Sequence, residues 1–80
     1  MLPRMDWPEV DDALEREFEF ASFSEAIAFV DRLAELAEGE NHHPDIDIRY
    51  RRVRVRWSTH SAGWITDRDR ELAARTDDLV

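Results

Sequence analysis

A strictly alternating segment in the middle of the chain limits the fold more than any other feature. In "RRVRVRW", residues 51–57, the apolar side chains of Val53, Val55 and Trp57 alternate with arginines. Successive side chains of a β-strand point to opposite faces, so the pattern predicts a strand with one buried and one charged face. Such a strand belongs to an antiparallel sheet whose outer face meets solvent.

Two further segments alternate in the same way. In "EREFEF", residues 15–20, the phenylalanines share one face and the glutamates the other. In "DIDIRY", residues 45–50, Ile46, Ile48 and Tyr50 share one face. We expect the second segment to pair with residues 51–57 as a hairpin that turns around residues 50–53.

Two helices are predicted from capping signals and apolar spacing. Ser22 and Glu25 form a capping box before a stripe with helical spacing, and Gly39 is the expected stop. Thr66 is the expected N-cap of the second helix, with Asp69 at its N3 position. The two inner faces are predicted to contain Ala26, Phe29, Val30, Leu33 and Ala37 in the first helix, and Leu72, Ala73, Thr76 and Leu79 in the second.

The first residues are harder to assign. Pro3 and Pro8 rule out a long helix, so we expect a short helical turn over residues 8–13 and a Trp7 that docks on the domain. The predicted order is strand, helix, strand, strand, helix. This is an α+β fold, an antiparallel sheet with helices packed on one face, in a single domain over residues 1–80 whose first 13 residues are an N-terminal extension.

The charge balance restricts the partners. The chain has 19 acidic and 11 basic residues, a net charge of −8, and all its bases are arginines. This balance argues against a nucleic-acid partner and an anionic membrane surface. An RNA-binding role for the arginine row (Arg52, Arg54 and Arg56) stays open, but a solvated face paired with acidic neighbours is favoured.

Other bulk features set the class of protein. No apolar run approaches the ~20 residues of a membrane span, and the start lacks a signal-peptide core, so we expect a cytoplasmic protein. A chain of 80 residues without cysteine has a thin core, so we expect a homo-oligomer.

All three histidines fall in one short window, and this is the strongest functional signal. "NHHPDIDIRY" contains His42 and His43, and "STHSAG" contains His60. The predicted hairpin would bring them together, where imidazoles suit acid–base catalysis. Glu38 and Asp69 are supporting candidates for substrate binding or ring orientation. A zinc site is disfavoured because His42 and His43 would point to opposite sides, and three histidines on an ordinary hairpin remain the alternative.

The spacing of these residues resembles a known signature. The order is Glu38, three residues, "HHP", five residues, Tyr50, nine residues, His60, eight residues and Asp69. This spacing closely resembles the pattern of the pterin-4a-carbinolamine dehydratases. The resemblance extends over roughly residues 14–78. One departure is Trp64, which stands where many relatives have a small residue, and it is expected to cover the site or alter its mouth.

The resemblance implies a four-stranded antiparallel sheet with helices on one side, in dimers or tetramers. It implies that the segment around residues 45–50 and its neighbours supply the fourth strand. The implied reaction is loss of water from 4a-hydroxytetrahydropterin to give the quinonoid dihydropterin, after use by an aromatic amino-acid hydroxylase. No metal and no bound cofactor would be needed, because the pterin is the substrate.

The resemblance also implies roles for single residues. His42 and His60 match the histidines that we assign to proton transfer, and His43 matches the one that we assign mainly to gripping the pterin. The roles are exchangeable, so all three histidines are catalytic candidates. Glu38 and Asp69 match the acidic ends of the signature. Pro44 and Tyr50 match structural positions, where Pro44 is expected to stiffen the loop and Tyr50 to pack from the strand. The rival interpretation is a non-catalytic interaction, assembly or coactivator module on the same scaffold.

Overall fold

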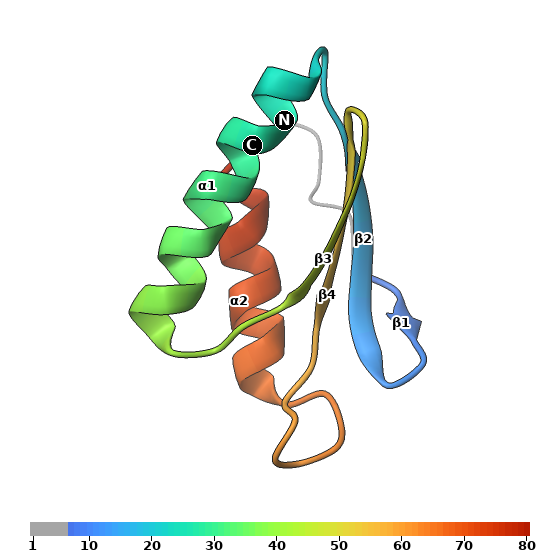
Figure 1. Ribbon diagram of the computed structural model, residues 1–80. Helices are drawn as coiled ribbons and strands as arrows, with labels where there is room; N and C mark the ends of the chain where they lie inside the picture. Colours follow the sequence, from blue (N-terminus) through green and yellow to red (C-terminus); the bar gives the residue numbers. More distant parts are fainter. Residues whose placement is uncertain (1–6) are drawn as a thin grey trace, which may run out of the picture.

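In the computed structural model, which describes residues 7–80, four strands form one antiparallel sheet with two helices on one face (Figure 1). The predicted α+β class is confirmed. Along the chain the elements are β1 (Glu9–Val10), β2 (Ala13–Glu19), α1 (Phe23–Glu40), β3 (Asp45–Arg49), β4 (Arg52–Trp57) and α2 (Asp67–Asp77). The sheet order is β1-β2-β4-β3, so the alternating segment that contains β4 lies in the interior of the sheet.

The face of the sheet beneath the helices contains the core. In the register of β4 with its neighbours, Val53 lies between Phe18 of β2 and Ile48 of β3, and Trp57 lies opposite Leu14. The predicted burial of alternate residues of β4 is confirmed, since Val53, Val55 and Trp57 are completely buried. The helices contribute the buried residues Ala26, Phe29, Leu33, Ala37, Leu72 and Ala73.

The opposite face of the sheet is charged, and the arginine row runs along its centre. Arg56 Nη1 lies 2.6 Å from Glu15 Oε1. Arg54 lies between Glu17 and Asp47, with N–O distances of 3.8 and 3.9 Å. The prediction that acidic residues of neighbouring strands pair with these arginines is confirmed.

The fourth strand comes from the N-terminal segment. The predicted helical turn over residues 8–13 is wrong, and so is the expectation that neighbours of residues 45–50 supply the fourth strand. Val10 pairs with Ala13 across a tight turn in which Asp11 and Asp12 have φ angles of 48° and 65°. Aspartate tolerates this left-handed conformation better than most residues, so the chain can reverse there without glycine.

Trp7 docks on the domain as predicted. Its ring packs edge-on against Phe18, with centroids 5.8 Å apart, and its Nε1 donates to the carboxylate of Asp77 at 3.1 Å. Trp7 is therefore anchored to the end of α2.

Helix α1 begins as predicted but ends later. Ser22 is its N-cap and accepts a hydrogen bond from the Glu25 N–H. Gly39 is not the stop, because the helix continues to Glu40 and Asn41 takes the left-handed conformation with φ of 50°. Asparagine is the usual alternative to glycine at this position. Asn41 therefore directs the chain out of α1 and into the histidine pair.

The hairpin of β3 and β4 turns at Tyr50 and Arg51. The expectation that Tyr50 packs from the strand is wrong, because Tyr50 lies in the turn with φ of 56° and is 70% exposed. In residues 7–80 no helix is long and apolar enough to cross a membrane.

Candidate functional site

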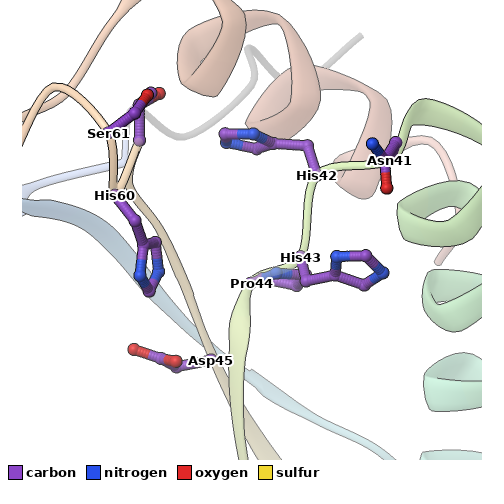
Figure 2. Close-up of a pocket in the computed structure, with 8 residues that line it drawn as sticks. Asn41, His42, His43, Pro44, Asp45, His60 and Ser61 are labelled. Atoms are coloured by element: carbon purple, nitrogen blue, oxygen red, sulfur yellow. The ribbon is translucent and has the colours of Figure 1, made fainter.

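The connection from α1 to β3 and the loop after β4 enclose one pocket with a volume of about 450 Å³ (Figure 2). The three histidines, which fall in one window of the sequence, thus line the same pocket. The size falls within the range of small-molecule pockets. The residues that line it are Asn41, His42, His43, Pro44, Asp45, Thr59, His60 and Ser61.

His42 is held on two sides. Its side chain is only 13% exposed, and its Nε2 lies 2.7 Å from Asp69 Oδ1. Its ring also lies parallel to the indole of Trp57, with centroids 5.7 Å apart and an interplanar angle of 7°. These contacts fix both the position and the tilt of the imidazole.

Asp69 is fully buried behind His42, at the start of α2. It completes the predicted capping box, because its Oδ2 accepts from the Thr66 N–H at 2.9 Å. The same oxygen accepts from the Thr59 hydroxyl at 2.6 Å. Burial raises the pKa of Asp69, but hydrogen bonds from Thr59, the Thr66 backbone and His42 outweigh this effect, so the pKa lies below its usual value.

The state of Asp69 determines which nitrogen of His42 bears hydrogen. An ionised carboxylate only accepts hydrogen bonds, so the Nε2 of His42 must be the donor. Within residues 7–80 the Nδ1 of His42 has no hydrogen-bond partner, so it is available to a substrate: it accepts a proton when the ring is neutral and donates one when the ring is charged.

His43 occupies the rim of the pocket. Figure 2 shows its ring on the α1 side, whereas the ring of His42 points toward the loop of His60. His43 Nε2 contacts the carboxylate of Glu38, and both side chains are largely exposed. Glu38 therefore contacts the pocket through His43 rather than lining it.

His60 approaches from the opposite wall, where its ring points toward Asp45 (Figure 2). A short bridge closes its loop, in which the Thr59 N–H donates to Trp64 O at 3.0 Å. Gly63, with φ of 66°, allows the reversal, and its N–H donates to Thr59 O at 2.9 Å. Trp64 is half exposed and is not one of the lining residues, so it does not cover the pocket as expected.

The structure thus separates the five predicted site residues into two groups. His42, His43 and His60 line the pocket, whereas Glu38 and Asp69 contact histidines from behind or beside it. Among residues 7–80 there is no group of three histidine, cysteine or acidic side chains arranged to hold a metal ion.

Sequence reasoning missed several residues of the site. Asn41, Asp45, Thr59 and Ser61 line the pocket, and Trp57 supports His42 from beneath. For Thr59 a signal was available, because a hydroxyl residue precedes His60 directly. For Trp57 the alternating pattern indicated burial only, since its contact with His42 depends on how the loop after α1 crosses the sheet.

Comparisons with known proteins agree on one family. The family model described as "Pterin 4 alpha carbinolamine dehydratase" matches residues 1–79. A relative from Chloroflexus aurantiacus, named "Putative pterin-4-alpha-carbinolamine dehydratase", is 49% identical over 80 residues, which are 100% of this chain and 86% of that protein. A relative of the same name from Thermomicrobium roseum is 53% identical over 74 residues, 92% of this chain and 80% of that protein.

Two solved structures are also similar. One is a transcriptional coactivator/pterin dehydratase from Brucella melitensis, with a TM-score of 0.87 and 36% identity, covering 92% of this chain and 81% of the other. The second is a pterin dehydratase-like protein identified as a RuBisCO assembly factor in the α-carboxysome. Its TM-score is 0.80 and its identity 29%, over 94% of this chain and 89% of the other.

Proposed function

Since the chain belongs to the pterin 4 alpha carbinolamine dehydratase family, we propose that it removes water from 4a-hydroxytetrahydropterin and releases the quinonoid dihydropterin. The observation that carries the proposal is the pocket between His42 and His60, in which buried Asp69 holds one ring nitrogen of His42 and leaves the other free. The reaction would return the pterin to use after a hydroxylase, such as one acting on aromatic amino acids, has oxidised it.

The chemistry needs one proton donor and one proton acceptor. A protonated imidazole gives its proton to the 4a-hydroxyl, and the carbon–oxygen bond breaks as water leaves. The electron pair of the neighbouring ring nitrogen forms the new C=N bond, and a second, neutral imidazole takes the proton of that nitrogen. The two transfers balance, so the protein ends with the same number of protons as it began with.

We assign the two transfers to His42 and His60, which approach the pocket from its two walls. His43 at the rim, with Glu38 beside it, is proposed to grip the pterin and to assist catalysis by fixing its orientation. Asp69 is proposed to act on the substrate through His42, because its carboxylate is fully buried.

The test is the dehydration rate of freshly generated 4a-hydroxytetrahydropterin, followed by ultraviolet absorbance. We expect the wild-type protein to accelerate the reaction over buffer, and His42→Ala and His60→Ala each to lose at least about tenfold of the rate. Asp31→Asn, an exposed substitution on α1 away from the pocket, is the control and should retain full activity. A folded wild-type protein that gives no acceleration would refute the proposal.

A second function has one specific observation in its favour. A protein of similar fold that is 29% identical to this chain is described as a RuBisCO assembly factor. The same scaffold here could therefore serve as a non-catalytic assembly or coactivator module. In that case the wild-type protein would not accelerate dehydration, and His42→Ala would leave binding to its protein partner unchanged.

We also propose that the protein works as a homodimer or homotetramer. The support is the small core of the chain and the isoleucines Ile46 and Ile48 on the edge strand β3, each 37% exposed. Light scattering after size-exclusion chromatography should give two or four times the mass of one chain. The mass of a single chain at micromolar concentration would contradict this.

A further inference from the structure

The hydroxyl of Thr59 occupies the junction between the two walls of the pocket. Thr59 immediately precedes His60, and its backbone N–H and C=O close the loop that holds His60. Its side chain contacts the start of α2, with Oγ1 2.6 Å from Asp69 Oδ2 and 2.8 Å from Thr66 Oγ1. One residue therefore contacts the loop of His60 and the carboxylate that holds His42.

The number of hydrogens on each group decides which group donates in each of these contacts. The Thr59 hydroxyl has a single hydrogen, and the ionised carboxylate of Asp69 can only accept it. The oxygen of Thr59 is then free to accept the hydrogen of the Thr66 hydroxyl. The result is a chain of hydrogen bonds from Thr66 through Thr59 to Asp69, which accepts from His42 Nε2 on its other oxygen. Hydrogen bonds in such a chain strengthen one another in a buried setting.

We propose that Thr59 is a positioning residue, whose hydroxyl fixes the carboxylate of Asp69 and thereby the Nε2–H tautomer and the orientation of His42. The inference rests on the proposed function, because it assigns Thr59 the task of positioning groups that act with His42 and His60. Without the hydroxyl, Asp69 Oδ2 keeps its bond from the Thr66 N–H at 2.9 Å but loses the shortest of its contacts. The Thr66 hydroxyl, 3.3 Å from the same oxygen, can then donate to it only over this longer distance. The carboxylate is then freer to rotate, and His42 loses its fixed donor geometry.

The variants isolate the hydroxyl. Thr59→Val keeps the branched shape and removes the hydrogen bond, whereas Thr59→Ser keeps the hydrogen bond and removes a methyl group. The backbone bonds that close the loop remain in both. Ser58→Ala is the matched control, because the Ser58 hydroxyl has no hydrogen bond to any residue in the described part of the chain.

The first readout is the tautomer of His42, measured through the ring nitrogens by NMR of the 15N-labelled protein. With only three histidines in the chain, the ring signals can be assigned by single substitutions. Neutral His42 should be mainly the Nε2–H form in wild type, Thr59→Ser and Ser58→Ala, and a mixture in Thr59→Val. A predominant Nδ1–H form in wild type, or an unchanged tautomer in a folded Thr59→Val, would overturn the proposal.

The second readout is kinetic. Thr59→Val should lower kcat for dehydration about tenfold or more while KM changes less than about threefold, and Thr59→Ser should restore most of the rate. Equal kcat in wild type and Thr59→Val would also overturn the proposal. If the valine variant does not fold, Thr59→Ala, which leaves room for a water molecule, takes its place in both measurements.

The two proposals fail separately. A wild-type protein without dehydratase activity refutes the proposed function, yet the tautomer of His42 still reports whether Thr59 fixes Asp69. Conversely, if the protein is active but the tautomer of His42 and kcat are unchanged in the Thr59 variants, only the positioning role is refuted.

Discussion

The imidazole of His42 lies parallel to the indole of Trp57, with ring centroids 5.7 Å apart and an interplanar angle of 7°. Trp57 is itself fixed, because its buried Nε1 donates to the Thr76 hydroxyl of α2 at 3.0 Å. Asp69, in the first turn of α2, holds the edge of the same imidazole. His42 is thus supported twice by one helix, directly through Asp69 and indirectly through Trp57.

Replacement of Asp69 by asparagine should strongly lower the dehydration rate in a protein that still folds. The amide has a similar shape, but its orientation is set by competing donors, so His42 loses its obligatory acceptor. We expect kcat to fall about 10- to 100-fold. Asp67→Asn, an exposed residue of the same helical turn, is the matched control. Equal kcat values for the two variants would show that Asp69 has no such role.

Replacement of Thr76 by valine should destabilise the fold. The substitution leaves the indole N–H of Trp57 buried without an acceptor, since both residues are completely buried. We expect the free energy of unfolding to fall by about 1–3 kcal/mol in urea titrations. Thr76→Ser, which keeps the acceptor, should lose less. A valine variant that is as stable as the wild type would show that the hydrogen bond to Trp57 does not contribute.

The state of Asp69 should make stability depend on pH in the acidic range. The pKa of Asp69 is lowered in the folded protein, so its contribution to stability is fully present above the unfolded value of about 3.9. The contribution is lost as the pH falls through the lower, folded pKa. Urea titrations between pH 7 and pH 3 should therefore show a smaller acid loss for Asp69→Asn than for wild type. Parallel curves for the two proteins would contradict the assignment.

The arginine row should not give the protein affinity for nucleic acid. Its members face glutamates and aspartates of β2 and β3, and the chain has a net charge of −8. We expect no electrophoretic shift of single-stranded RNA near physiological salt. A salt-dependent shift that Arg54→Gln weakens would revive the RNA-binding interpretation.

Local patterns were enough to predict most of the fold. Alternation predicted β2, β3 and β4, and the capping residues Ser22 and Thr66 predicted the helix starts. Both signals involve only residues close together in the sequence. Strand β1 is only two residues long, and its pairing depends on two left-handed aspartates that no periodicity reveals. The end of α1 was misplaced because glycine and asparagine compete for the same terminal role only two residues apart.

The histidines could be predicted to meet, but the surroundings that govern them could not. The capping pattern placed Asp69 at N3 of α2, yet its contacts with Thr59 and His42 depend on how three segments distant in sequence meet. The same is true of the ring contact between His42 and Trp57.

The position of Asp69 makes α2 a control element for a pocket that it does not line. Every residue described as lining the pocket belongs to the segments 41–45 and 59–61, outside α2. A condition or a binding protein that draws α2 away from the sheet would nevertheless release Asp69 from His42 and Thr76 from Trp57. The proposed dehydration rate would then depend on the docking of a helix, and the proposed activity would be lost at an earlier stage of unfolding than the one that melts the sheet.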